Sequence, residues 1–385
     1  MRFCSSILVA ALVLALLISA APNRIDNGLR AGIPFELWGK TVLIPVRVNG
    51  SRPLAFILDS GASSGAVLDL ALARRVRAPL GRKLQGSGAG AGSVDLWEID
   101  STRVAVDLGP LRVHTGRVLA LDFSNQHGIL GHAMDGVLGY DFFARWIVEI
   151  DYETQMLRLY DPAFYRYRGH GERLPLTFEH RVPHVRAVLE VPGQPPAERV
   201  LLIDTGSEDA VDDSLIARSS GTRLDVVGGV GTGQEYRVTA ARASQLGLGR
   251  LRLRDVPGAG PGVSLIGGEI LRRFRVIFDF PHHQMILEPN RHFGDAFATD
   301  ASGLSLRLSD DGGAFVAHDV IAGSPGAESG IRTGDHIVAI DACPARQLDL
   351  VRAQRSLEES GRTCVIEIER GGARLTRRVR LRSLF

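Results

Sequence analysis

An internal repeat is the feature that most restricts how this chain can fold. The segment LGYDFFARWIVEIDYETQMLRL, which contains Gly139 and Asp151, matches IGGEILRRFRVIFDFPHHQMIL, which contains Gly267 and Asp279. The spacing from the glycine to the aspartate is the same in both copies, and one inserted residue precedes a shared Gln-Met pair. Because a repeated segment indicates a repeated structural unit, the sequence predicts two related lobes in one chain.

A second motif opens each lobe. In FILDSGASSG an apolar run leads into Asp59, and in VLLIDTGSED a similar run leads into Asp204. Strand-like runs joined by Asn49–Gly50 and Pro192–Gly193, which are strong turn signals, precede the two motifs. Each lobe therefore has the same order: hairpin, Asp-Ser/Thr-Gly, glycine cluster, apolar-apolar-Gly and final strands.

The motif order also predicts the domain boundaries and the fold class. The two lobes cover about residues 30–165 and 170–292, with the glycine clusters at Gly86–Gly92 and Gly228–Gly233. After Asn290 the pattern changes, and residues 300–385 alternate strands and turns with two short helical stretches. Short strands between tight turns are typical of β-rich folds. We expect a mainly β protein with two pseudo-symmetric lobes and a small α+β unit at the C-terminus.

The first residues are typical of an export segment. Arg2, an apolar run over residues 7–18 and small residues at 19–21 predict a signal peptide or an N-terminal anchor over residues 1–21. The apolar run is shorter than the roughly 20 residues that a membrane span needs. We expect an exported protein, periplasmic or extracellular, in which Cys343 and Cys364 could form a disulfide. The formal net charge of the 385-residue chain is +2, which provides no electrostatic case for a nucleic-acid partner.

The paired aspartates predict acid–base chemistry. A carboxylate at the end of an apolar strand is costly to bury alone, so the residues after Asp59 and Asp204 are expected to support it. Two lobes related by a pseudo-twofold axis would bring the carboxyls face to face, where they would share one proton. One could then act as general base and the other as general acid on a water between them. Gly61 and Gly206 are expected to let the chain turn sharply and to let backbone N–H groups approach the carboxylate. Ser60 and Thr205 are expected to add hydroxyls that brace the turn.

With these motifs, the chain resembles the aspartic peptidase superfamily of pepsin-like and retroviral-type enzymes. ILDSGASS and LIDTGSED match its Asp-Thr/Ser-Gly signature, and the VLG ending at Gly139 and the LIG ending at Gly267 match its apolar-apolar-Gly element. The resemblance covers roughly residues 35–290. It implies two β-barrel lobes, a catalytic dyad of Asp59 and Asp204, and an aspartic endopeptidase that acts as a monomer on protein or peptide substrates, without a metal or another cofactor.

The resemblance also assigns a role to the glycine clusters. They would be flap hairpins that close over a substrate, although the first cluster lacks the tyrosine that pepsin-like flaps usually carry. The expected flap residues are Gly86, Gly88, Gly90, Gly229 and Gly231.

The C-terminal unit resembles a PDZ domain. AGSPGAESGIRTGDHIVAID is similar to the core of bacterial PDZ domains, and SGLSLRL is similar to the carboxylate-binding loop with the strand that follows it. Such a domain adds an extended peptide to its sheet and holds the peptide's terminal carboxylate with backbone N–H groups. The resemblance implies that C-terminal peptides bind at Gly303, Leu304, Ser305 and Leu306.

Two other functions are compatible with parts of the sequence. A catalytically silent, peptide-binding scaffold would have the same fold, because fold does not imply activity. GASSG also fits the Gly-x-Ser-x-Gly elbow of esterase-type hydrolases, with Ser63 as nucleophile, but that elbow requires a strand before it and a helix after it.

Two further patterns invite binding-site readings. GSGAGAG could be a dinucleotide-binding loop only if a helix followed it, and the alternating run SVDLWEID predicts a strand instead. The histidines His127, His132, His282 and His283 match no common metal-site spacing.

Overall fold

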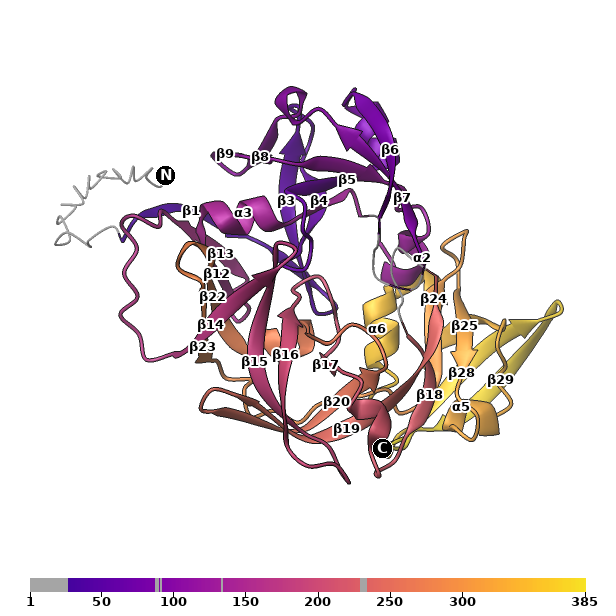
Figure 1. The fold of residues 1–385 in the computed structure, drawn as a ribbon. Helices are drawn as coiled ribbons and strands as arrows, with labels where there is room; N and C mark the ends of the chain where they lie inside the picture. The colour runs from indigo at the N-terminus through magenta and orange to yellow at the C-terminus, as the bar shows by residue number, and fades with distance from the viewer. Residues whose placement is uncertain (1–26, 87–89, 91, 133, 229–233) are drawn as a thin grey trace, which may run out of the picture.

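The computed structural model describes residues 27–86, 90, 92–132, 134–228 and 234–385 (Figure 1). Most of the elements are strands and the helices are short, which confirms the predicted mainly β fold. No helix within these ranges is both long and apolar enough to cross a membrane. The predicted export segment at residues 1–21 lies outside the described residues, as do the predicted flap glycines Gly88, Gly229 and Gly231.

The first lobe is built around the strand that leads to Asp59. Its elements are β2 (Glu36–Trp38), β3 (Thr41–Val48), β4 (Leu54–Leu58), β5 (Ala66–Asp69), α1 (Leu70–Arg75), β6 (Leu80–Gly86), β7 (Val94–Ile99), η1 (Ser101–Arg103), β8 (Val106–Leu108), β9 (Leu111–Val113), β10 (Val118–Leu121), α2 (Gln126–Leu130) and β11 (Gly136–Leu138). The strand order is β6-β7-β10-β5-β11-β4-β3-β8-β9, with β2 beside β3. β4 pairs antiparallel with β3 and parallel with β11, so both of its edges are hydrogen-bonded.

Strands from both copies of the repeat form one shared sheet. Its elements are β1 (Leu29–Pro34), α3 (Tyr140–Arg145), β12 (Ile147–Asp151), β13 (Met156–Tyr160), β14 (Glu172–Glu179), β22 (Phe274–Asp279), η3 (Phe280–His282) and β23 (Gln284–Pro289). The strand order is β1-β13-β12-β22-β23-β14. β12 and β22, which are equivalent strands of the two copies, pair antiparallel with Ile150 opposite Val276. The repeat thus joins the lobes directly.

The second lobe continues this sheet. Its elements are β15 (Val182–Glu190), β16 (Ala197–Ile203), β17 (Val211–Asp212), η2 (Ile216–Arg218), β18 (Leu224–Gly228), β19 (Tyr236–Leu248), β20 (Leu251–Gly260), β21 (Leu265–Ile266) and α4 (Gly268–Leu271). From β14 the order runs β15-β16-β21-β17-β20-β19-β18, and β15 also pairs with β19. That extra pairing closes β15, β16, β21, β17, β20 and β19 into a barrel, and β18 extends from β19 at the end of the strand order.

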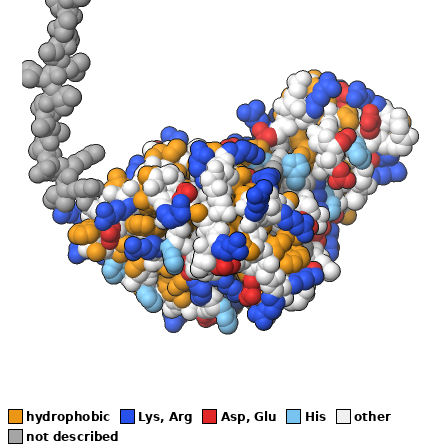
Figure 2. Space-filling view, turned by 90° about the horizontal axis from the view of Figure 1, so that it is seen from above, with side chains coloured by type: hydrophobic (Ala, Val, Ile, Leu, Met, Phe, Trp, Pro, Cys, Tyr) orange, Lys and Arg blue, Asp and Glu red, His pale blue; other side chains and the backbone are white. Residues whose placement is uncertain are grey.

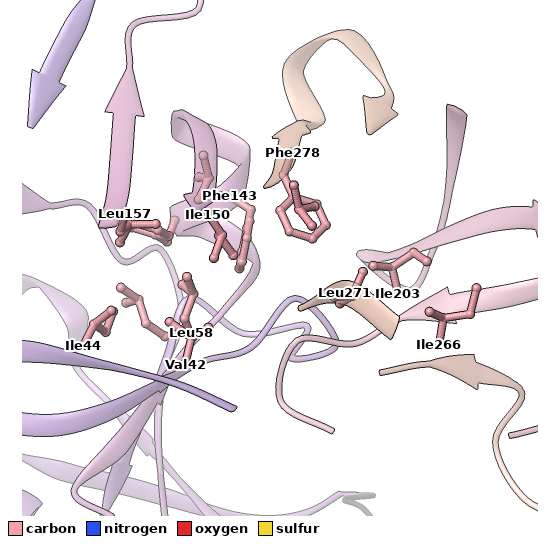
Figure 3. Packing of buried hydrophobic residues seen from close by; sticks show 14 of the residues in the cluster. Val42, Ile44, Leu58, Phe143, Ile150, Leu157, Ile203, Ile266, Leu271 and Phe278 are labelled. Atoms are coloured by element: carbon pink, nitrogen blue, oxygen red, sulfur yellow. The ribbon is translucent and has the colours of Figure 1, made fainter. Parts of the chain in front are cut away.

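One apolar core runs through both lobes. Figure 3 shows its first-lobe and shared-sheet side chains together with those of the second lobe. The rings of Phe143 and Phe278 meet edge to face with centroids 5.2 Å apart. Leu58 and Ile203, which come directly before the two aspartates, are fully buried in this core. A close-packed common core fixes the two aspartate-bearing strands relative to each other.

The C-terminal unit has a separate core and a separate sheet. Its elements are β24 (Leu304–Leu308), β25 (Phe315–Val320), α5 (Pro325–Glu328), β26 (His336–Ile340), β27 (Cys343–Pro344), η4 (Ala345–Gln347), α6 (Leu350–Arg355), β28 (Thr363–Arg370) and β29 (Ala373–Arg380). The strand order is β24-β25-β26-β28-β29, with β27 beside β26. Gly371 and Gly372 join β28 to β29 with positive φ angles of 56° and 78°, a backbone that glycine adopts without strain.

The surface carries charges of both signs (Figure 2), and the two described cysteines are unpaired. On the face in Figure 2, Lys and Arg side chains are interspersed with acidic and apolar ones. Cys343 and Cys364 are free thiols in this structure rather than a disulfide. Burial raises the pKa of Cys364 to about 12, so its thiol stays protonated at neutral pH.

Candidate active site

Equivalent hydrogen bonds place the two aspartates at the ends of their strands. The Asp59 N–H donates to Leu138 O at 2.9 Å, and the Asp204 N–H donates to Ile266 O at 2.9 Å. In each lobe the acceptor is the residue before the glycine of the apolar-apolar-Gly element, on a strand that runs parallel to the aspartate-bearing strand. The two motifs that the sequence links in each lobe therefore meet as one local structure.

Backbone N–H groups of the following turn hold each carboxylate. Asp59 Oδ1 accepts hydrogen bonds from the N–H groups of Gly61 and Ala62, at 2.7 and 3.0 Å. Asp204 Oδ1 accepts one from the N–H of Gly206 at 2.8 Å. Such bonds favour the ionised form and fix its direction, so each turn orients its own carboxyl.

Ser60 and Thr205 connect the two turns across the lobes. The N–H of each residue donates to the side-chain hydroxyl of the other, at 3.0 and 3.1 Å. The Ser60 hydroxyl in turn donates to Ile203 O at 2.6 Å, and the Thr205 hydroxyl donates to Leu58 O at 2.7 Å. Both residues are fully buried. This reciprocal arrangement, which we call the interlobe brace, joins the ends of both aspartate-bearing strands.

The two glycines of the signature make room for the opposite carboxyl. A Cβ on Gly61 would lie 2.8 Å from Asp204 Cγ, and a Cβ on Gly206 would lie 2.7 Å from Asp59 Cγ. Neither glycine has a positive φ angle. The sequence predicts glycine at these positions because of a sharp turn and a close backbone approach. The space that each glycine leaves for the facing carboxyl is the stricter requirement.

The pKa values of the two carboxyls are both raised above the usual range of an aspartate. Burial, the charge of Asp204 and a hydrogen bond between the two carboxyls hold the pKa of Asp59 well above its usual range. Burial also raises the pKa of Asp204, against the opposing hydrogen bonds from Gly206 and from Asp59. Both shifts have the sign expected for a pair that retains one proton when free carboxyls have lost theirs.

The described residues of the glycine clusters border two strand pairs, β6–β7 and β18–β19, which we call the first and second hairpins. Gly86 ends β6, and Gly90 lies in the β6–β7 connection. Of the second cluster only Gly228, the last residue of β18, lies within the described residues. A Cβ on Gly92 would lie 3.9 Å from the Gln234 side chain, so the two connections approach each other.

Asp212 is a titratable group that the sequence argument missed. It ends β17, and its Oδ1 accepts the N–H of Ala259 at 3.0 Å. Burial and the neighbouring charge of Asp209 raise its pKa to about 8. The signal was present in the acid-rich run SEDAVDD, but sequence alone could not show that two of these carboxyls lie together.

The structural contexts of the alternative motifs differ from those they need. Ser63 is exposed in a loop that enters strand β5, so the strand–turn–helix elbow is not formed around it. GSGAGAG leads into strand β7 rather than a helix. Among the described residues, no group of three or more His, Cys, Asp or Glu side chains is placed to hold a metal ion.

Comparison with known families follows the same division of the chain. Residues 44–142 match the family model described as aspartyl protease, and residues 302–381 match the PDZ domain model. The chain contains an aspartyl protease domain and a PDZ domain. The aspartyl protease match includes Asp59 and Gly139. Asp204 lies outside the matched residues, and it is the equivalent of Asp59 by the internal repeat and by the interlobe brace. A search of curated proteins found no match.

The PDZ domain places the predicted peptide contacts at the start of β24. Gly303 has a φ of +75°, and a Cβ there would lie 2.1 Å from the Cβ of Ser324, so only glycine fits. Its N–H donates to Asp300 Oδ2 at 2.5 Å, and the N–H of Leu304 donates to Ser302 Oγ at 3.1 Å.

Proposed function

We propose that this protein is an aspartic endopeptidase that hydrolyses peptide bonds in protein or peptide substrates with the Asp59/Asp204 dyad. The observation that carries the proposal is the interlobe brace. It ties the residue after each aspartate to the opposite strand, while a glycine on each side leaves room for the opposite carboxyl. A pair of strand-end aspartates with only a capping role would not require this cross-lobe reciprocity.

The shared proton supplies both catalytic roles. The ionised carboxyl takes a proton from a water molecule as the water oxygen adds to the peptide carbonyl carbon, and the protonated carboxyl donates its proton to the carbonyl oxygen. When the C–N bond breaks, the carboxyl that gained a proton gives it to the leaving nitrogen. A hydroxyl proton of the intermediate returns to the other carboxyl, so the dyad again holds one proton. The steps balance without a cofactor.

Inhibition separates this mechanism from a serine nucleophile. A statine-type transition-state mimic is expected to block cleavage of a peptide library, with one inhibitor bound per chain, because both carboxyls lie on the same chain and a monomer is complete. A serine-directed phosphonylating agent should leave cleavage unchanged, since Ser63 has no part in the mechanism. The measurement is cleavage by mass spectrometry with inhibitor titration. Inactivation by the phosphonylating agent, or one inhibitor per two chains, would contradict the proposal.

For the PDZ domain we propose binding of peptide C-termini along β24. We expect a Kd on the order of micromolar for a free-acid peptide, because a short added strand buries little surface. Amidating the C-terminus should weaken binding, since the amide lacks the charge that backbone N–H groups favour. Fluorescence anisotropy with matched free-acid and amidated decapeptides tests this. Equal binding of the two peptides would refute the carboxylate loop at Gly303–Leu306.

We further propose that the chain acts outside the cytoplasm. The support is the apolar segment over residues 7–18, preceded by Arg2 and followed by small residues. Cell fractionation of the expressed full-length chain, with N-terminal sequencing of the product, distinguishes a cleaved signal from a retained anchor. A full-length product confined to the cytoplasm would refute export.

A further inference from the structure

A short helix of the first lobe lies against the edge of the PDZ sheet. Figure 1 shows α2 beside β24, the first strand of that sheet, and the two elements are in contact. A Cβ on Gly128 would lie 3.4 Å from Leu308 O, at the end of β24. A Cβ on Gly131, which ends α2, would lie 2.5 Å from the Cβ of Leu350, at the start of α6. The α2 segment thus contacts both β24 and α6.

These contacts are at one end of the peptide site proposed above. A peptide whose carboxylate lies at Gly303 would extend along β24, and its preceding residues would reach Leu308 after roughly 16 Å, at about 3.3 Å per residue. That is the end of β24 on which Gly128 lies. Leu350 is nearly fully buried in the PDZ core, so the α6 side of this contact is held in place. The described position of α2 therefore overlaps the path of a peptide longer than about five residues.

We propose that α2 is an internal occupant of the far half of the PDZ peptide site, and that a long peptide must displace α2 to bind. This inference rests on the proposed peptide-binding function of the PDZ domain. The inference adds two points. In the described structure the aspartyl protease domain covers part of the peptide site, and peptide binding is coupled to the β6–β7 and β18–β19 hairpins.

The link to the first hairpin passes through Leu130. Its carbonyl oxygen accepts a hydrogen bond from Trp38 Nε1 at 2.6 Å. Leu130 and Trp38 pack on an apolar cluster that includes Leu96 of β7 and Ala62, whose N–H holds the Asp59 carboxylate. Movement of α2 away from the PDZ domain would disturb this cluster, and with it the β6–β7 hairpin and the turn after Asp59.

Ion pairs connect the second hairpin to the same edge of the PDZ domain. Glu235, in the β18–β19 connection, forms an ion pair with Arg307 of β24, and its Oε2 lies at hydrogen-bond distance, 2.8 Å, from Nε2 of His318 in β25. Arg237 of β19 pairs with Asp319 of β25 at 2.8 Å. The first hairpin is thus linked to β24 through α2, and the second hairpin contacts β24 and β25. β24 is the strand beside which a peptide would add.

This arrangement predicts a reciprocal coupling. A peptide that binds only after α2 has moved pays for that movement, so its apparent affinity is reduced by the fraction of molecules in the open state. By linkage, a bound peptide favours the open state and releases the hairpins to the same extent. We therefore expect the covered state to be the less active one.

A length series tests the occupancy in the full chain. Competition against a fluorescein-labelled decapeptide is measured for a tetrapeptide and a decapeptide with identical apolar C-terminal residues and free carboxylates. The variant is Gly131→Ala, whose methyl group would collide with Leu350. The matched control is Gly50→Ala, because Gly50 has the same φ of +74° but no neighbouring atom within 4 Å. Both substitutions strain the backbone equally, and only the first acts on α2.

In the wild type and in Gly50→Ala, lengthening the peptide should add little affinity. In Gly131→Ala the decapeptide should bind about 5- to 150-fold more tightly than in the wild type, the usual range of allosteric coupling, while the tetrapeptide should bind all three proteins alike. Equal decapeptide affinities for all three folded proteins would overturn the inference and leave the proposed peptide site intact. Absence of carboxylate-dependent binding to all of them would overturn the peptide site itself and the inference with it.

A cross-linked variant keeps the test decisive if Gly131→Ala does not fold. In Gly131→Cys/Leu350→Cys, a shift of about 1 Å would bring the Cβ atoms to disulfide distance, and oxidation would lock α2 onto α6. Oxidation should abolish the gain in affinity that comes from lengthening the peptide. It should also abolish the rise in library-peptide cleavage caused by added decapeptide, and reduction should restore both effects. Peptide binding and cleavage that are the same in the oxidised and reduced forms would refute the occupancy.

Discussion

Asp59→Asn, Asp204→Asn and the double variant are all expected to lose cleavage to a similar extent, by at least about 10²- to 10⁴-fold, the usual contribution of one general acid–base group. The reason is that both carboxyls act on one water and share one proton, so removing either removes the whole mechanism and the losses do not add. The measurement is kcat/KM for a peptide identified in the library profile.

The matched control for the dyad is Ser63→Ala, which lies four residues after Asp59 on an exposed loop and should retain most of the activity. Turnover by folded Asp204→Asn at the wild-type rate would refute the aspartic mechanism. Loss of activity in folded Ser63→Ala would favour the serine alternative. Similar loss in all dyad variants, with a separate loss of peptide binding, would instead indicate a damaged fold, which circular dichroism detects.

Asp59→Asn, Asp204→Asn and the double variant should be more stable than the wild type at neutral pH. A carboxyl whose pKa is raised in the folded state stays protonated there while the unfolded chain has lost its proton, so folding stability falls as pH rises above about 4, the pKa of an unfolded aspartate. Asn carries no charge and removes this penalty. Each 1 kcal/mol gained would raise Tm by about 2–4 °C for a domain of 150–250 residues. The gain should disappear below about pH 3, where both proteins are neutral at this site.

The pH profile of the wild-type enzyme follows from the shared proton. Activity should be bell-shaped in kcat/KM, because the dyad is active only with one proton. The acid limb reflects the first ionisation of the pair and the basic limb reflects the second. Since burial and mutual repulsion raise the pKa of Asp59 well above its usual range, the basic limb should lie above the range of a free carboxyl. A profile that stays flat through both limbs would contradict a shared proton.

The second large effect is expected at the interlobe brace. Thr205→Val keeps the shape of the side chain but removes the hydroxyl that donates to Leu58 O and accepts the Ser60 N–H. Two buried backbone groups would lose their partners, at about 1–3 kcal/mol each, so we expect a loss of about 2–6 kcal/mol in the free energy of unfolding. Activity of the folded fraction should also fall, because the strand end at Leu58 positions Asp59.

Thr205→Ser is the matched control for the brace. It keeps the hydroxyl and both hydrogen bonds and loses only a methyl group, so its stability and activity should stay much closer to those of the wild type. Urea unfolding and kcat/KM are measured for both variants. If Thr205→Val and Thr205→Ser behave alike, the methyl group rather than the hydrogen bonds matters, and the brace does not hold the dyad.

Several features of this protein could be predicted from residues close together in the sequence. The alternation of apolar residues and turn signals predicted strands on both sides of Asn49–Gly50 and Pro192–Gly193, and β3, β4, β15 and β16 lie there. Local hydrogen bonding explains this success, since a strand's pattern and a tight turn's residues depend mainly on their own backbone. The strands, turns and short helices of the C-terminal unit were predictable for the same reason. Ser324 caps α5, and Gly371–Gly372 forms the β28–β29 turn.

The paired motifs also predicted which residues would be chemically active, but not how they would be held. The repeat indicated that Asp59 and Asp204 occupy equivalent positions, and Ser60 and Thr205 were expected only to support their own turns. In the structure their hydroxyls instead cross between the lobes, over 145 positions of sequence. Similarly, Gly61 and Gly206 were explained by local turn geometry, whereas the facing carboxyl excludes any side chain there.

The sequence by itself therefore determined the mainly β fold, the duplication and the identity of the two aspartates, because apolar periodicity, turn residues and repeats are properties of neighbouring positions. Only the tertiary structure decided that β12 and β22 join the two copies in one sheet, that the brace crosses between the lobes, and that α2 lies on the edge of the PDZ domain. These contacts depend on which buried surfaces fit together after the chain has closed long loops, and no pattern of adjacent residues encodes that fit.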